Sequence, residues 1–337
     1  MKKWMLLIYV ALMGAISLYA VEPAFASNAA ISPDGNQVCF VYDSDLWLVP
    51  FNGGVSRRLT KTTVDEWNPQ WSPDGKTIAF SSNREGGGFV CLIPASGGEA
   101  KVLIRENMGV SDWYSDSKYL LCTKYSIQWG RSFYKVPIDG SRPVMIAEIG
   151  NSFATLSPDN KQIVFQRGGY PDREAYKGSA NGELWKLDIA SMKYTKLTNT
   201  DTSELYPRFS HSSDALYYCA AVGEQLQVLK ADKLNFKKAQ NISNLKQFSA
   251  RDISIARSND RIVFEVFNEL YTYDPGIKNG NKVKKLQIDL ASDDWQDTIV
   301  RMHMRNEVDS YTVSTDEKLV AFNYKYDTFM VPRKGGD

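Results

Sequence analysis

Short apolar runs, each preceded by a turn signal, recur along almost the entire chain. The clearest example spans residues 71–82, where Ser-Pro-Asp-Gly is followed by the apolar run 77–80. Proline fits the second position of such a turn because its φ is fixed, and Asp and Gly suit the capped and positive-φ positions that follow. The pattern predicts a β-hairpin with a short buried strand after the turn.

The same turn returns at a nearly constant interval. Its aspartate position is occupied in turn by Asp34, Asp74, Asp116, Asp159, Ser212, Ser258 and Asp316. The successive spacings are 40, 42, 43, 53, 46 and 58 residues, and helical periodicity is nearly absent. Units of four short strands at a period in the forties are typical of propeller blades. We therefore predict an all-β fold, a six-bladed β-propeller of four-stranded blades followed by the start of a second propeller.

The repeat divides the chain into three parts. We predict a signal peptide over residues 1–26, the six-bladed propeller over 27–295, and a linker with a truncated first blade of a second propeller over 296–337. The seventh unit stops after its third predicted strand. A blade without its fourth strand leaves an unpaired edge, which proteins normally avoid. We expect that the missing strand comes from elsewhere or that the chain is a fragment of a longer protein.

The first residues carry the pattern of an export signal. Two lysines precede an apolar run over residues 4–20, and Ala24-Phe25-Ala26 supplies a cleavage pattern before Ser27. An uncleaved membrane anchor is the alternative, since the apolar run is only just short of a spanning helix. We expect an exported protein, periplasmic or secreted, that has no membrane contact after cleavage of the signal.

Charge and cysteine content narrow the class of protein. The chain has 40 Lys and Arg against 39 Asp and Glu, a formal net charge of +1. No nucleic-acid partner is expected, because such surfaces need a marked basic excess. Disulfides can form in an exported protein. The cysteines, however, stand at apolar positions of predicted strands, which favours buried free thiols at Cys39, Cys91, Cys122 and Cys219.

No catalytic, cofactor-binding or metal-binding residue emerges from the motifs. His211 and His303 are the only candidate bases. His211 stands where other units have proline, and we interpret it as a solvated turn residue and not as a catalytic base. The evidence that His303 is a catalytic base is no stronger. The chain lacks a G-x-S-x-G elbow, a phosphate-binding loop and zinc spacing. The sequence Asp43-Ser44-Asp45 lacks the remainder of a calcium loop. We expect no cofactor.

One insertion stands out as a candidate binding loop. The fourth unit carries extra residues over 170–182, with Arg173, Tyr176 and Lys177 and several glycines. Long loops are where binding functions concentrate. The loop could cover a propeller mouth or contact a neighbouring domain, and a solvated loop without function is an equal alternative.

The later units resemble one family in particular. Ser-Pro-Asp-Gly blades are similar to those of TolB-like propellers and of the propellers of prolyl oligopeptidases. A more specific resemblance is to tricorn-type serine proteases. The end of their first propeller and the first blade of their second are similar, in order and spacing, to residues 261–265, 269–271, 284–288, 315–322 and 329–332. The insertion over residues 170–182 is similar to that family's fourth blade.

The resemblance implies a function without supplying a catalytic residue. Tricorn-type enzymes place a six-bladed and a seven-bladed propeller before a PDZ domain and two catalytic core domains, and their Ser and His lie in those cores. The resemblance implies a non-catalytic propeller that scaffolds catalytic domains and gates the passage of peptides. Its expected partners are peptides or protein domains of the same polypeptide or complex, and a homo-oligomer is possible. The alternatives are a free-standing TolB-like propeller that binds a partner protein and the propeller of a prolyl-oligopeptidase-like hydrolase.

Overall fold

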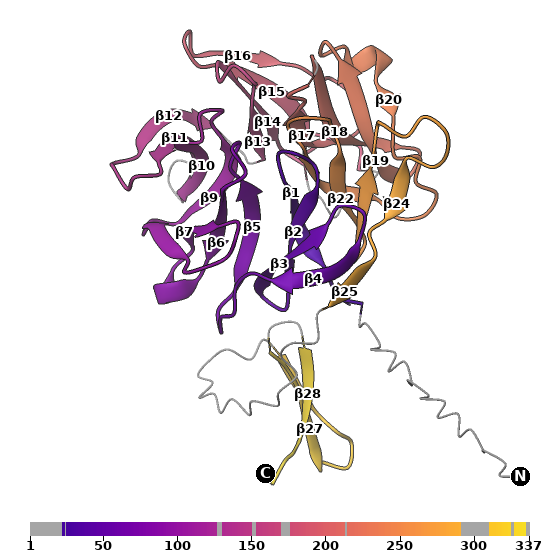
Figure 1. The fold of residues 1–337 in the computed structure, drawn as a ribbon. Helices are drawn as coiled ribbons and strands as arrows, with labels where there is room; N and C mark the ends of the chain where they lie inside the picture. The colour runs from indigo at the N-terminus through magenta and orange to yellow at the C-terminus, as the bar shows by residue number, and fades with distance from the viewer. Residues whose placement is uncertain are drawn as a thin grey trace, which may run out of the picture.

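Six successive β-sheets surround a central axis in the computed structural model (Figure 1). The structure describes residues 22–23, 25–126, 130–149, 153–169, 176–212, 214–290, 310–324 and 327–334. Each of the six sheets contains four strands in chain order, and the first sheet gains a fifth, β25. A separate sheet of three strands, β26 to β28, follows. The predicted all-β, six-bladed fold is confirmed.

The strands follow the repeat closely. Blades 1 to 3 contain β1 (Ser27–Ile31), β2 (Gln37–Tyr42), β3 (Asp45–Pro50), β4 (Gly54–Arg58), β5 (Glu66–Trp71), β6 (Thr77–Ser82), β7 (Phe89–Pro94), β8 (Lys101–Ile104), β9 (Met108–Trp113), β10 (Tyr119–Ser126), β11 (Gly130–Pro137) and β12 (Val144–Ile149). Blades 4 to 6 contain β13 (Ala154–Leu156), β14 (Gln162–Arg167), β15 (Glu183–Asp188), β16 (Lys193–Lys196), β17 (Glu204–Phe209), β18 (Ala215–Val222), β19 (Gln225–Asp232), β20 (Gln240–Asn241), β21 (Ala250–Ile255), β22 (Ile262–Val266), β23 (Glu269–Tyr273) and β24 (Val283–Lys285). The remaining elements are β25 (Ile288–Leu290), β26 (Ser310–Val313), β27 (Leu319–Tyr324), β28 (Asp327–Pro332) and the short 3-10 helices η1 (Arg84–Gly86) and η2 (Phe236–Lys238).

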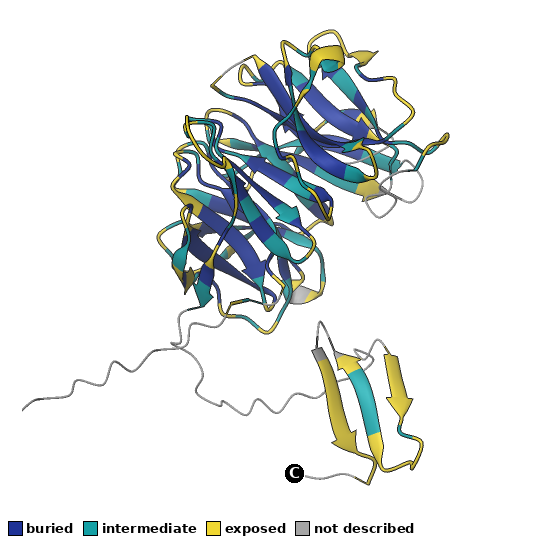
Figure 2. Ribbon diagram, turned by 90° about the vertical axis from the view of Figure 1, so that its right-hand side faces the viewer, coloured by how far each residue is buried: buried dark blue, intermediate teal, exposed yellow. Residues whose placement is uncertain are grey.

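The apolar core is divided among the spaces between blades. Six clusters of buried side chains are found, and each joins two neighbouring blades. Successive residues of a strand point to opposite faces of its sheet. In β2, Phe40 therefore packs towards blade 6, whereas Cys39 packs towards blade 2. Within the six blades, Figure 2 shows the buried residues in the strand interiors and the exposed ones mainly in the turns. A blade is thus stable only between its two neighbours.

The ring closes between blades 6 and 1 without a shared strand. All four strands of blade 1 come from one continuous segment, so closure depends on other contacts. The short strand β25 leaves blade 6 and pairs in parallel with the outer strand β4, Ile288 opposite Gly54 (Figure 1). At the turns, Arg261 donates a hydrogen bond to the carbonyl of Gly35 over 3.2 Å, and its guanidinium lies 4.7 Å from the ring centroid of Phe51. The sequence analysis did not predict β25, because it assigned this segment to the linker between the sixth and seventh units.

The cysteine prediction is confirmed, because the four cysteines are buried and free. Burial raises the pKa of the thiols of Cys39, Cys122 and Cys219 above the usual range. Such thiols are unreactive, and their role is packing. Across the described segments, no helix is long and apolar enough to cross a membrane. The predicted signal peptide lies almost entirely outside the described residues, and it stays a prediction together with the division at residues 295 and 296.

The strand β25 allows the closure of the ring to be tested at two adjacent glycines. Both Gly53 and Gly54 have positive φ, but a Cβ on Gly53 would lie 2.6 Å from the carbonyl oxygen of Gln287, whereas one on Gly54 would meet nothing within 4 Å. We expect both Gly53→Ala and Gly54→Ala to lower the free energy of unfolding by about 1–2 kcal/mol, because alanine is strained at positive φ. Only Gly53→Ala should lower it further, through the clash with Gln287. Thermal unfolding measures the loss, and hydrogen exchange at residues 288–290 should rise only in Gly53→Ala. Equal behaviour of the two variants would contradict this role of β25.

Candidate functional site: the central channel

The innermost strands of the six blades face the propeller axis and share a local distortion. In each blade we consider the residue six positions before the aspartate position of the turn. In five of the six blades this residue has a positive φ, between +42° and +55°: Asn28, Asn68, Phe153, Tyr206 and Asp252. In β1, β5, β17 and β21 the pairing register shifts at this residue. An extra residue of this kind bends the strand and redirects its side chain. The distortion turns a ring of polar and aromatic side chains towards the channel.

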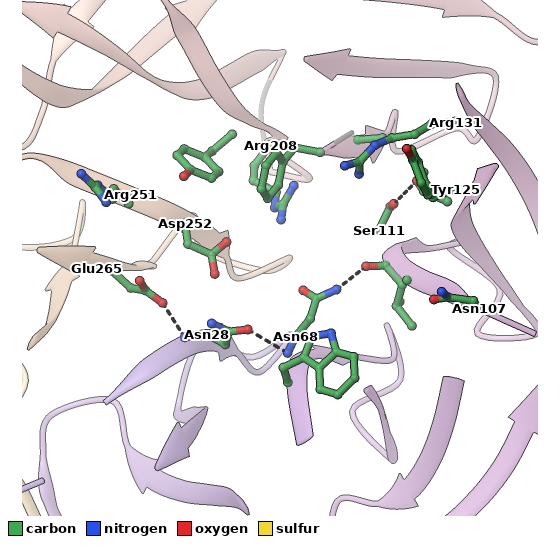
Figure 3. Close-up of a pocket in the computed structure, with 17 residues that line it drawn as sticks. Asn28, Asn68, Asn107, Ser111, Tyr125, Arg131, Arg208, Arg251, Asp252 and Glu265 are labelled. Atoms are coloured by element: carbon green, nitrogen blue, oxygen red, sulfur yellow. Dashed lines mark hydrogen bonds between the residues drawn. The ribbon is translucent and has the colours of Figure 1, made fainter. Parts of the chain in front are cut away.

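These side chains line the wide chamber, a cavity of about 610 Å³ on the axis (Figure 3). Its charged lining residues are Arg131, Arg208, Arg251, Asp252 and Glu265. Its aromatic lining residues are Trp67, Tyr125, Phe153 and Tyr206. Cavities of about 300–1,000 Å³ with a few polar groups among apolar walls are typical of ligand sites. The wide chamber is therefore the candidate site.

A chain of hydrogen bonds fixes one wall of the wide chamber across four blades. The carboxylate of Glu265 in blade 6 accepts a hydrogen bond from the backbone N–H of Asn28 in blade 1. The side-chain oxygen of Asn28 accepts one from the N–H of Asn68 in blade 2 over 3.0 Å. The Nδ2 of Asn68 then donates to the carbonyl of Val110 in blade 3 over 2.6 Å (Figure 3). These bonds link the bulges of successive blades into one rigid surface.

The two carboxyl groups of the wide chamber have unusual acidities. Burial raises the pKa of Glu265 from 4.5 to about 8, and the neighbouring charge of Asp252 adds to the shift, while the N–H of Asn28 and the cation of Arg251 oppose it. Burial also raises the pKa of Asp252, against the effect of Arg208. Two nearby buried carboxyls cannot both ionise fully at neutral pH. The three arginines therefore outweigh them, and the wide chamber carries net positive charge.

Below the wide chamber the channel narrows to a neck of about 40 Å³. Arg257 follows β21 in blade 6 and reaches across the axis to the opposite blade 3. Its Nη2 lies 3.3 Å from Oδ1 of Asp112 and 3.2 Å from the carbonyl oxygen of Trp113. Asp112 also accepts hydrogen bonds from the N–H of Leu156 over 2.8 Å and the hydroxyl of Thr155 over 3.0 Å in blade 4. This bridge separates the wide chamber from a cavity of about 790 Å³ at the Ser-Pro-Asp-Gly turns.

His211 also lies at the neck, and here the sequence interpretation was wrong. The residue was expected to be solvated, but the structure places it half-buried, with Nδ1 3.3 Å from Nη1 of Arg257. Burial, followed by the charge of Arg257, lowers the pKa of His211 from 6.5 to about 4. A histidine of this acidity is neutral at physiological pH and is a poor general base. No hydroxyl or thiol of the described residues hydrogen-bonds to its ring.

The residues proposed from the sequence as a binding loop lie elsewhere. Arg173 falls outside the described residues, as does His303. Tyr176 is half-buried, Lys177 is exposed, and neither lines the wide chamber. Whether this loop binds a partner stays a prediction. The channel residues were missed because they do not form a motif along the chain. The sequence feature that could have identified them is a residue that differs from its equivalents in the other units. Arg257 and His211, for example, both occupy the position of Pro33 in the first unit.

The comparisons with known proteins agree with this architecture. Residues 22–279 match the family model described as the tricorn protease N-terminal beta propeller domain. The chain belongs to this family. A tricorn protease homolog from Saccharolobus solfataricus is 25% identical over 269 residues, which cover 77% of this chain and 24% of the relative. A protein from Sulfurisphaera tokodaii, named as a tricorn-like protease N-terminal subunit, is 30% identical over 167 residues, which cover 46% of this chain and 84% of that protein.

A solved structure shows the same fold. The crystal structure of the tricorn protease superposes with a TM-score of 0.64 at 17% identity and covers 91% of this chain and 30% of that one. The tricorn N-terminal propeller family is also related to TolB-like propellers, to which this chain has weaker matches. The chain spans about a quarter of the length of the tricorn protease homologs it matches. The activity of the complete relatives is therefore not transferred from these matches.

The acidity of Glu265 gives a pH-dependent stability that can be measured. The folded state holds the proton of Glu265 more tightly than the unfolded chain, so this group lowers the free energy of unfolding as pH rises from about 4.5 towards 8. Glu265→Gln keeps an acceptor for Asn28 and removes the titration. We expect its stability relative to wild type to grow by about 1–3 kcal/mol between pH 5 and pH 8.

Urea unfolding at several pH values measures this difference. Glu99→Gln, which removes an exposed carboxylate, is the control for the change in net charge. A difference between Glu265→Gln and wild type that is constant over this pH range would contradict the burial of an acidic pair in the wide chamber.

Proposed function

We propose that this chain is the non-catalytic propeller part of an exported tricorn-type serine peptidase. In this role it scaffolds catalytic domains and gates the passage of peptides to or from them. The partners we propose are peptides together with domains of the same polypeptide or of the same complex. The observation that carries the proposal is the channel itself, in which a wide chamber of about 610 Å³ meets a neck of about 40 Å³.

The chemistry of the described residues supports a non-catalytic role. Nucleophilic catalysis needs a base within hydrogen-bond distance of the nucleophile. The described histidine, His211, contacts Arg257 instead. The cysteines are buried, with raised pKa for Cys39, Cys122 and Cys219, so they are unsuited to attack a peptide bond. Peptide hydrolysis would then depend on groups supplied by other domains or subunits.

Export is part of the proposal and is supported by the first residues. Two lysines, an apolar run and Ala24-Phe25-Ala26 form the pattern of a cleaved signal. The position of the first strand fits this interpretation, since β1 begins at Ser27, directly after the predicted cleavage point. Cleavage there would keep every strand of the propeller, but it would remove the buried Ala26 and the ion pair of Glu22 with Lys285.

Binding of a partner protein without peptidase domains, as proposed for a TolB-like propeller, is the second candidate. The observation that favours it is a pair of exposed aromatic rings. Phe248 and Phe267 stack with centroids 5.0 Å apart, although their side chains are 49% and 67% exposed. Phe267 also has φ of +59°, which is rare for a bulky residue. Exposed aromatic groups of this kind are common where proteins associate.

One purification separates the two candidates. We expect the processed chain, expressed alone, to hydrolyse a mixture of unstructured peptides no faster than buffer, because in the part of the chain that the structure describes no nucleophile is hydrogen-bonded to a histidine. We expect the same protein, isolated under native conditions from its own cells, to co-purify with peptide hydrolysis that a serine-directed inhibitor abolishes. Hydrolysis by the isolated chain that follows it through size exclusion would contradict the proposal. Native material with a stoichiometric partner protein but no hydrolysis would establish the second candidate instead.

A further inference from the structure

Arg208 is an unusual residue within the wide chamber. It lies on β17 and is only 9% exposed, so its guanidinium is largely removed from water. Among the described residues it makes one hydrogen bond, from Nη1 to the neighbouring carbonyl of Pro207 over 3.1 Å. In the same part of the chain no carboxylate forms an ion pair with it at 4.0 Å or less, although the charge of Asp252 on the same wall interacts with that of Arg208. A buried cation with neither a close ion pair nor a full set of hydrogen bonds is costly, and natural proteins seldom retain one without a compensating contact.

The guanidinium of Arg208 is directed towards the middle of the wide chamber. Figure 3 shows Arg208 and Arg131 approaching each other over the centre of the cavity, with Arg251 at its side. In the same view Asp252 lies between Arg251 and Arg208, and Glu265 lies beside Asp252. Arginine has five N–H donors in a planar fork that matches a carboxylate. Most of the donors of Arg208 therefore remain available to a group that enters the cavity.

The shape of the wide chamber suits a ligand larger than a bare ion. The cavity of about 610 Å³ has the aromatic rings of Trp67, Phe153 and Tyr206 and the amides of Asn68 and Asn107 in its walls. These groups can pack against the apolar parts of a peptide and bond to its backbone. Below Arg208 the channel narrows to about 40 Å³, which is room for roughly one water molecule. While the bridge of Arg257 to Asp112 closes this neck, a ligand that reaches Arg208 must enter and leave by the same mouth, and passage through the channel requires the bridge to open.

We propose that the wide chamber is a blind binding pocket for a carboxylate carried by a peptide, with Arg208 as the anchoring cation and Arg131 as its neighbour. The inference rests on the proposed function only for the choice of a peptide as the ligand, because the binding of an anion follows from the cavity alone. Arg257 acts as a positioning residue, since its bridge to Asp112 closes the floor beneath the bound group.

Calorimetric titration of the processed chain with four probes tests the proposal. The probes are a triglutamate peptide blocked at both ends, a trialanine peptide with a free carboxyl end, a blocked trilysine peptide and inorganic phosphate. We expect at least one of the two carboxylate peptides to bind, and the comparison between them identifies the source of the carboxylate. We expect Arg208→Met to weaken that binding at least tenfold and Arg131→Met to weaken it less.

The stability of Arg208→Met distinguishes a binding role from a structural one. If Arg208 is kept for a ligand, its replacement by an apolar side chain of similar length should leave the melting temperature of the free protein unchanged or higher. Arg142→Met, which removes an exposed arginine outside the pocket, is the matched control and should bind like wild type.

Several results would overturn the inference. They are binding that Arg208→Met leaves unchanged, preferential binding of trilysine, and the absence of binding by either carboxylate peptide at millimolar concentration. Binding of phosphate alone would retain an anion site but overturn the peptide as its ligand. None of these results bears on whether the isolated chain hydrolyses peptides, so a failure here differs from a failure of the proposed function.

Discussion

The structure depends on the requirement that each blade bury both of its faces. A four-stranded sheet with apolar residues on both sides cannot be stable alone, and here six apolar clusters lie between neighbouring blades, one for each interface of the ring. The interface between blades 6 and 1 joins segments more than 200 residues apart without a shared strand. The pairing of β25 with β4, together with the contacts of Arg261, holds this interface closed.

Closure of the ring creates the channel, and the bulges of the inner strands determine its chemistry. The bulge residues have positive φ, and polar side chains among them, such as Asn28, Asn68 and Asp252, lie on the channel wall. The hydrogen bonds between them tie the wall to the ring. Charged residues also reach the channel from a fixed position in the repeat. Asp112 and Arg208 both stand four residues before the turn position in their units, where the first unit has Ala30. The same repeat that builds the core thus presents to the axis two positions whose residue type varies between blades, six and four residues before the turn position.

The sequence predicted the fold well because a repeated turn is a local signal. Ser-Pro-Asp-Gly specifies its own backbone geometry, and each copy locates two strands, so six blades could be counted along the chain. The candidate site could not be predicted in the same way. Arg257 meets Asp112 only because blades 6 and 3 face each other across a closed ring, a contact between residues 145 positions apart. Strand β25 was missed for the same reason, since three residues of modest apolar character indicate no partner by themselves. The loop with Arg173, Tyr176 and Lys177 attracted notice as an insertion, whereas the channel residues are single substitutions within intact units.

The proposed function requires that peptides bind inside the channel and not on the outer surface. Photo-crosslinking measures this directly: the native protein is irradiated with an acidic peptide that carries a photoreactive group, and the attachment points are mapped by mass spectrometry. We expect attachment to the inner strands that line the wide chamber, chiefly β17 and β21. Attachment confined to the outer strands of the blades or to the exposed pair Phe248 and Phe267 would contradict it.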